Sequence, residues 1–191
     1  MTLEEWADLP EDEDGEIVDG VLVEDEMGSF LHDGVVAWII ALLVTWGRPR
    51  GARIAASEAK YGVARGRGRK PDVSVYLKGD RRPPPRGLIR VPPSIMVEVV
   101  TPTPRDQRRD RVDKLREYAA FGVRFYWLVD PEARTFDILE LLPGEGHYAH
   151  RVAASTGTVA QVPGCDALTI DLDDLWREVD QILADESADP H

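Results

Sequence analysis

The feature that most constrains this fold is a run of apolar residues interrupted by one acid. Residues 94–100 read Ser-Ile-Met-Val-Glu-Val-Val, and such a run is typical of a strand covered on both faces in the middle of a sheet. Glu98 lies inside it. A buried carboxylate is energetically costly unless a partner or a metal ion compensates for its lost hydration. We therefore expect Glu98 to have a function.

A second acid, Asp72, opens another apolar strand, which is predicted over residues 72–77 directly after Pro71. Adjacent strands lie about 4.8 Å apart, so if the two strands are neighbours, both carboxylates can hold one divalent cation. The backbone carbonyl of Val99 offers a further oxygen ligand. Mg²⁺ or Mn²⁺ suits such oxygen donors, and a cation that also holds a water is the minimum for cleaving a phosphodiester. The expected metal ligands are thus Asp72, Glu98 and Val99.

Lys114 is the natural third catalytic residue beside Asp72 and Glu98. It lies on a basic helix that is predicted from about residue 106 to residue 121 and ends at Gly122. A lysine near a metal-bound water can orient that water or stabilise developing negative charge. The alternative is a solvated lysine that pairs with Asp110 one helical turn earlier.

Three further residues are candidates for the same site. Glu58 and Glu16 are possible additional acidic ligands, although a surface salt bridge to the nearby Lys60 is the simpler reading for Glu58. His32 opens an apolar helix over residues 31–46. It is a candidate base or substrate contact, and the alternative is a purely structural histidine near a helix start.

The charge distribution points to a polyanionic partner. The net charge is −12, but residues 48–116 contain 19 Lys or Arg against 7 acids, a local charge of +12, whereas residues 1–47 contain 13 acids and no Lys or Arg. A segment of this kind favours binding to DNA, unless its charges scatter over different faces. The basic side chains expected to contact nucleic acid are Arg65, Arg67, Arg69, Lys70, Arg105, Arg108, Arg109 and Arg111.

Strands interleaved with helices predict an α/β fold, with a mixed central β-sheet flanked by helices. We expect one domain over residues 1–183 and a flexible C-terminal tail over residues 184–191. The half-exposed strand 135–141 is a candidate edge for a homodimer. One cysteine in 191 residues excludes a disulfide framework and fits a reducing cytoplasm. The longest apolar run, near 12 residues, is shorter than the roughly 20 needed to span a bilayer, so no membrane partner is expected.

Several of these residues occur together in a known family. The sequence resembles the Uma family of "putative restriction endonucleases", which belongs to the PD-(D/E)XK nuclease superfamily, from about Leu3 to Trp176. The pieces that carry the resemblance are Glu16-Ile-Val-Asp-Gly20, His32, Pro71-Asp72-Val73, Val97-Glu98-Val99-Val100-Thr101-Pro102, Asp110-Arg-Val-Asp-Lys114-Leu115, Tyr118, Gly122-Val123 and Tyr126-Trp-Leu-Val-Asp-Pro131.

The resemblance implies a restriction-endonuclease-like fold, a Mg²⁺ or Mn²⁺ cofactor and DNA as substrate. It also implies Asp72 as the motif aspartate and Glu98 as the second acid. The superfamily's lysine would follow that acid by two residues, where this chain has Val100. In the family that this sequence resembles, a lysine on the following helix takes over this role. The resemblance implies that Lys114 is that lysine.

Two other functions stay open on the sequence alone. The missing lysine at Val100 and the acidic flanks are compatible with a catalytically inactive nuclease-fold module that binds DNA or a protein partner. A metal-dependent phosphodiesterase acting on a small nucleotide is the third possibility.

Overall fold

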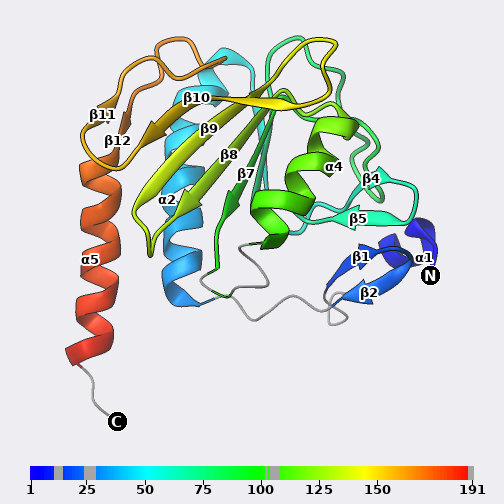
Figure 1. The fold of residues 1–191 in the computed structure, drawn as a ribbon, viewed down its shortest axis with the longest axis horizontal. Coiled ribbons are helices and arrows are strands. Elements are labelled where there is room, and N and C mark those ends of the chain that lie inside the picture. The colour runs from blue at the N-terminus through cyan, green and yellow to red at the C-terminus, as the bar shows by residue number, and fades with distance from the viewer. Residues whose placement is uncertain (11–14, 24–28, 102, 104–107, 189–191) are drawn as a thin grey trace.

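A mixed β-sheet forms the centre of the molecule (Figure 1). The computed structural model describes residues 1–10, 15–23, 29–101, 103 and 108–188. The sheet has six strands in the order β10 (Tyr148–Ala154), β9 (Thr135–Leu141), β8 (Phe125–Asp130), β7 (Ile95–Val99), β6 (Val73–Tyr76) and β3 (Arg53–Ala56). Only β7 and β8 run parallel, because α4 connects them, and every other pair in this sheet is antiparallel. The predicted α/β architecture is confirmed.

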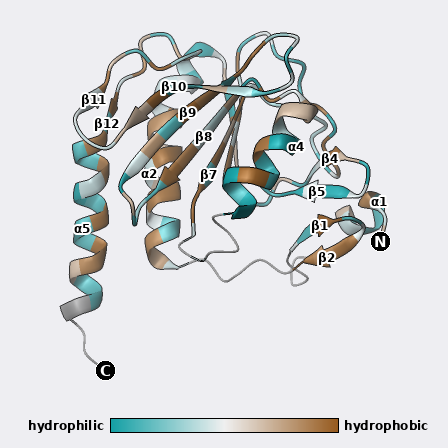
Figure 2. Cartoon of the chain, viewed as in Figure 1, coloured by the Kyte–Doolittle hydropathy of each residue, from teal (hydrophilic) through white to brown (hydrophobic). Residues whose placement is uncertain are grey.

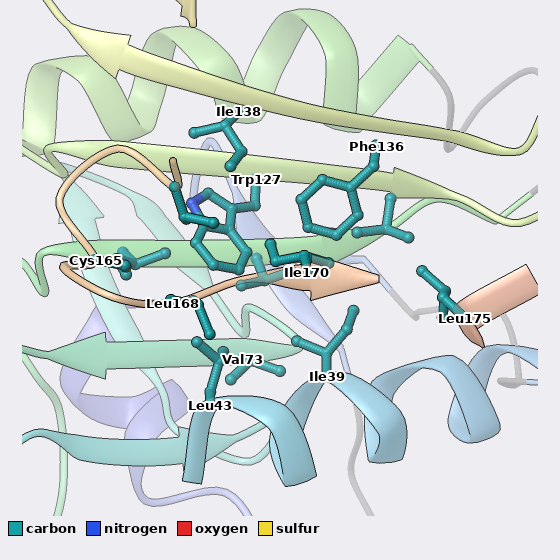
Figure 3. Packing of buried hydrophobic residues seen from close by; sticks show 14 of the residues in the cluster. Ile39, Leu43, Val73, Trp127, Phe136, Ile138, Cys165, Leu168, Ile170 and Leu175 are labelled. Atoms are coloured by element: carbon teal, nitrogen blue, oxygen red, sulfur yellow. The ribbon is translucent and has the colours of Figure 1, made fainter. Parts of the chain in front are cut away.

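Helices cover both faces of this sheet (Figure 1). The helices α2 (Phe30–Gly47) and α5 (Leu172–Ala188) lie on one face, and α4 (Lys114–Phe121) lies on the other. Figure 3 shows Ile39 and Leu43 of α2 facing Val73 and Trp127 of the sheet. Because both faces are covered, β7 and β8 are hydrophobic along most of their length (Figure 2). That coverage is why residues 94–100 lack alternation.

The alternation of side chains along β7 decides where its acid lies. Ile95, Val97 and Val99 belong to the core beneath α2 and α5, whereas Met96 and Val100 belong to the core beneath α4. Successive side chains of a strand point to opposite faces. Glu98 therefore lies on the α4 face, among residues that would otherwise form an apolar core.

A smaller sheet lies beside α4. Its strands are β2 (Val21–Val23), β1 (Glu16–Val18), β5 (Arg67–Arg69) and β4 (Tyr61–Ala64), and the short helix α1 (Leu3–Ala7) packs against it. A tight hairpin joins β1 and β2 at Asp19-Gly20, whose φ values are 53° and 79°. Residues 65–66 form the turn between β4 and β5, and Arg67–Arg69 pair with both β1 and β4. Two short strands, β11 (Thr158–Val159) and β12 (Ile170–Asp171), pair separately.

Two expectations about outer elements need correction. Strand β9 cannot supply a free edge for a homodimer, because it pairs with β8 on one side and with β10 on the other. The terminal helix continues to Ala188, so residues 184–188 are helical rather than a flexible tail.

By length and composition alone, Phe30–Arg50 would suffice to cross a membrane, and in the structure one side of that segment packs against the central sheet.

The smaller sheet depends on a close approach between Gly68 and Trp6. A Cβ atom on Gly68 would lie 2.5 Å from the Trp6 ring, so Gly68→Ala should lower the free energy of unfolding by about 1–3 kcal/mol through overpacking. Urea unfolding measures this loss. In a Trp6→Leu background, which removes the clashing ring, the same substitution should cost much less. An equal loss in both backgrounds would contradict the packing explanation.

Candidate active site

Asp72 and Glu98 lie opposite each other on neighbouring strands. Val73 of β6 pairs with Val97 of β7, and continuing that register by one residue places Asp72 across from Glu98. Directly opposed residues on one face have Cβ atoms about 5 Å apart. The Asp72 carboxylate also accepts the Val99 backbone N–H at 2.7 Å. The two acids that the sequence singled out therefore meet at one end of β6 and β7.

Lys114 points into the same place from α4. Its Nζ donates to Glu98 Oε2 at 2.8 Å and lies 3.3 Å from Asp110 Oδ1 and 3.5 Å from Glu16 Oε1. The Lys114 side chain is only 3% exposed. It is thus no solvated lysine, although it does lie within ion-pair distance of Asp110. Burial alone would lower the pKa of Lys114, but the surrounding carboxylates raise it above its usual value, so the side chain is an ammonium ion at neutral pH.

Glu98 is held from two sides. While Lys114 bonds one carboxylate oxygen, the Tyr118 hydroxyl donates to the other, Oε1, at 2.6 Å. Burial raises the pKa of Glu98 above the usual carboxyl range. Lys114 opposes this rise, whereas the negative charges of the neighbouring acids reinforce it. The site therefore carries an excess of crowded carboxylates, which a bound cation would relieve.

Glu16 enters the site from the smaller sheet through a buried chain of charges. Arg69 donates to Glu16 at 2.7 Å and makes a bidentate contact with Glu117 of α4, with its Nε 2.6 Å from Oε2. Burial would raise the pKa of Glu16, but the charges of Lys114 and Arg69 lower it overall. Glu16 is thus an anion with two cationic partners, and the Arg69–Glu117 contact links β5 to α4.

His32 approaches Asp72 from the first turn of α2. Its Nε2 lies 3.3 Å from Asp72 Oδ2, and the Ser29 side chain caps the helix by accepting the His32 N–H. Burial would lower the pKa of His32, but the hydrogen bond and charge of Asp72, helped by Asp33, raise it to about 9. In this state the imidazole is a cation at neutral pH and has no free lone pair with which to act as a base.

These side chains surround one hollow of about 210 Å³. Its lining includes Glu16, His32, Glu58, Lys70, Asp72, Glu98, Val99, Arg109, Asp110 and Lys114. The hollow thus brings together every predicted catalytic, metal-binding and additional residue. Glu58 is at its exposed rim, where it pairs with Lys70 at 3.0 Å rather than with Lys60 as expected. Lys60 instead donates to the Trp6 carbonyl.

The basic residues predicted to bind nucleic acid divide into different groups. Arg69 was wrongly placed among them, because it is 1% exposed and both of its acidic partners are internal. Arg67 and Arg111 are partly exposed and paired with acids. Arg65 and Arg108 are exposed. Lys70 and Arg109 line the hollow, and Arg105 lies outside the described residues.

The donors present fit a hydrated divalent cation. Within the described part of the chain, no three acidic, histidine or cysteine side chains converge closely enough to enclose an ion. Mg²⁺ usually keeps several waters and is bound through only one or two carboxylates. Asp72 and Glu98 supply two such carboxylates at one hollow, and Val99, whose backbone carbonyl is a further hard oxygen donor, also lines it. Their chemistry matches Mg²⁺ or Mn²⁺ better than a thiolate- or imidazole-binding metal.

Sequence reasoning gave no functional role to Asp110, Glu117 or Tyr118. Asp110 was considered only as a helical partner of Lys114, and Tyr118 only as part of the family resemblance. The spacing 110, 114, 118 was the available signal, since residues four apart share one helix face. A π-helical segment, Arg109–Asp113, leads directly into α4, and such segments are frequent at functional sites.

Comparisons with known proteins concern the family and the fold. The family model Uma2, described as "Putative restriction endonuclease", matches residues 2–173. A crystal structure titled as a putative nuclease belonging to DUF820, from Anabaena variabilis, is similar with a TM-score of 0.74 and 18% identity over 94% of this chain and 99% of that chain. At this identity the likeness shows the fold alone.

A second solved structure is more distant. The type IIG restriction endonuclease BpuSI has a TM-score of 0.40 and 13% identity over 87% of this chain and 19% of that chain. No curated protein matches the sequence.

Removing the Lys114 ammonium should be strongly destabilising. Lys114→Met leaves three buried carboxylates without their shared cation, so we expect the free energy of unfolding to fall by about 3–5 kcal/mol. Urea unfolding at pH 7 measures the loss. It should shrink as the pH is lowered toward about 5, because unpaired buried carboxylates take up protons more readily than unfolded ones. The control is Arg116→Met, at an exposed position of the same helix, where little change is expected.

His32 should make stability depend on pH in the alkaline direction. Its folded pKa of about 9 exceeds the ordinary value of 6.5, so its contribution is complete below pH 6.5 and is lost as the pH rises through about 9. The difference in unfolding free energy between wild type and His32→Gln should decline across that window. His150→Gln, at an exposed histidine, serves as control. A difference that stays constant up to pH 10, on the order of one unit above the folded pKa, would refute the Asp72 contact.

Proposed function

The chain belongs to the Uma2 family of restriction-endonuclease-like proteins, and on that premise we propose that it is a metal-dependent DNA endonuclease. The family is one of nucleases, and the fold is that of a nuclease-like α/β domain. One observation carries the proposal for this chain. Asp72 and Glu98 oppose each other on neighbouring strands, and Lys114 reaches Glu98 at 2.8 Å inside the same hollow.

The roles follow from the position and charge of each group. Asp72, Glu98 and the Val99 carbonyl would hold Mg²⁺ or Mn²⁺, which supplies charge neutralisation and an activated water when it is bound. Hydrolysis forms a bond from a water oxygen to phosphorus and breaks the bond from phosphorus to the leaving oxygen. The proton that the attacking water gives up to solvent is balanced by the proton that the leaving oxygen takes up from solvent. Lys114 is an ammonium ion, so it can orient the water as a hydrogen-bond donor and stabilise negative charge on the phosphoryl oxygens, but it cannot accept the proton of the water.

The surroundings of the hollow support a polyanionic substrate. Lys70 and Arg109 line it, and His32 adds a positive charge next to Asp72. Arg65 and Arg108 are exposed in the same basic part of the sequence. These groups would attract the phosphate backbone without reading its sequence. DNA is the substrate that we propose, because the family is one of restriction-endonuclease-like proteins.

One structural feature favours a second candidate function. Both Glu98 oxygens already accept hydrogen bonds from Lys114 and Tyr118, and the position two residues after the acid is Val100, which is buried in the core. A domain that has stopped cutting and only binds DNA would keep this internally paired acid. Such a domain should bind DNA in a salt-sensitive way without needing a divalent cation.

Plasmid cleavage with Mg²⁺, Mn²⁺ or a chelator tests the nuclease directly. We expect cleavage by wild type only with a divalent cation, and a loss of about 100-fold or more in Asp72→Asn, because a neutral amide is a poor cation ligand. Asp80→Asn is a matched control. Asp80 also accepts a backbone N–H at 2.6 Å, from Leu77, but lines a separate pocket.

The outcomes separate the two candidate functions. Equal cleavage by wild type and Asp72→Asn would refute the assigned metal site. A folded wild-type protein that cuts with neither metal, yet binds DNA in the chelator, would favour the binding module.

A further inference from the structure

Helix α4 presents two hydrogen-bond donors to Glu98. Lys114 and Tyr118 are four residues apart and so lie on one face of the helix. The Lys114 ammonium bonds Oε2 at 2.8 Å, and the Tyr118 hydroxyl bonds Oε1 at 2.6 Å. Each oxygen of a carboxylate can accept about two hydrogen bonds. Both oxygens of Glu98 therefore accept a hydrogen bond, and each still has a lone pair available for a further ligand.

The two donors differ in charge, and this difference separates their roles. A divalent cation at Glu98 repels the Lys114 ammonium and competes with it for the same anion. The neutral Tyr118 hydroxyl meets no such repulsion. Lys114 also has other anions within reach, with Asp110 Oδ1 at 3.3 Å and Glu16 Oε1 at 3.5 Å. Lys114 can thus move away from Glu98 without becoming an unpaired buried charge. The Tyr118 hydroxyl is not repelled by the cation and keeps its hydrogen bond to Glu98.

The Tyr118 ring is held rigidly. It is fully buried and meets the Tyr126 ring edge-on, with centroids 5.2 Å apart and an interplanar angle of 85°. The Tyr126 hydroxyl in turn donates to the Asp110 backbone carbonyl at 3.0 Å. A rigid ring fixes the place of its hydroxyl, and the hydroxyl fixes the orientation of the Glu98 carboxylate. Groups that orient a ligand in this way commonly tune metal affinity.

We propose that Tyr118 is the positioning residue that holds Glu98 ready as a cation ligand, so that Lys114 can turn from Glu98 toward the reacting groups. This inference rests on the proposed metal site and adds a division of labour within it. Tyr118 keeps the carboxylate in place in both states. Lys114 neutralises Glu98 before the cation arrives and is displaced when it does.

Mn²⁺ binding, followed by the electron paramagnetic resonance signal of the free ion, tests the proposal without any cleavage assay. Tyr118→Phe keeps the ring and removes the hydroxyl, and we expect Mn²⁺ affinity to fall about 10- to 100-fold. Tyr76→Phe is the matched control, because this buried tyrosine also loses one hydroxyl bond, made at 2.7 Å to the Val91 backbone carbonyl, and does not line the hollow. The Mn²⁺ affinity of this control should stay within about 3-fold of wild type. Its unfolding temperature should fall by about as much as that of Tyr118→Phe.

Activity then gives a second readout. High Mn²⁺ should rescue cleavage by Tyr118→Phe but not by Asp72→Asn, because only the former keeps both carboxylate ligands. Wild-type affinity in Tyr118→Phe would overturn the positioning role and leave the proposed nuclease intact. An absence of Mn²⁺ binding by folded wild type would overturn both.

A measurement on wild-type protein covers the case in which Tyr118→Phe fails to fold. The chain has 5 tyrosines and four lysines, so nuclear magnetic resonance with ¹³C at tyrosine Cζ and ¹⁵N at lysine Nζ can resolve each group. On adding Mg²⁺, the Lys114 Nζ signal should shift, whereas the Tyr118 Cζ signal should stay that of a hydrogen-bonded phenol. A Tyr118 signal that moves to the free phenol position while Lys114 is unchanged would refute the division of labour.

Discussion

The arrangement of the site depends on the buried contact between Lys114 and Glu98. Glu98 stands where the α4 side of β7 would otherwise be apolar, and its charge is tolerable only because an ammonium and a phenol lie within hydrogen-bond distance. The same ammonium also lies near Glu16 and Asp110. One cation therefore holds together acids from the central sheet, from the smaller sheet and from the helical segment before α4.

This dependence explains why a small second sheet accompanies the central one. The sheet carries Glu16 on β1 and Arg69 on β5, and Arg69 ties both to Glu117 of α4. Close packing of Trp6 on Gly68 leaves no space for a side chain at that point of β5. The smaller sheet thus places an additional carboxylate beside Asp72 and Glu98 and fixes the helix that carries Lys114. A substrate would meet a site assembled from three separate layers of structure.

The sequence predicted the central sheet and its acid pair well because these features are local. An acid inside a valine-rich strand and an acid after Pro71 are visible as single anomalies in a regular pattern, and the family resemblance pointed to the same residues. The prediction was wrong about Arg69, which has the composition of a nucleic-acid contact but is internal. Charge along a sequence does not reveal which face a side chain occupies, and residues 67–69 pair not only with the preceding strand β4 but also with the distant residues Ile17 and Val18 of β1.

The sequence by itself determined the α/β pattern, the buried strands and the identity of Asp72 and Glu98 as acids in unfavourable surroundings, because periodicity and burial cost are properties of short segments. Only the tertiary structure decided that β6 and β7 are neighbours in a register that opposes these acids. It also decided that Lys114 is buried, that Tyr118 holds Glu98, and that β9 is internal. These facts depend on contacts between residues far apart in the chain, and no local pattern encodes the distances among them.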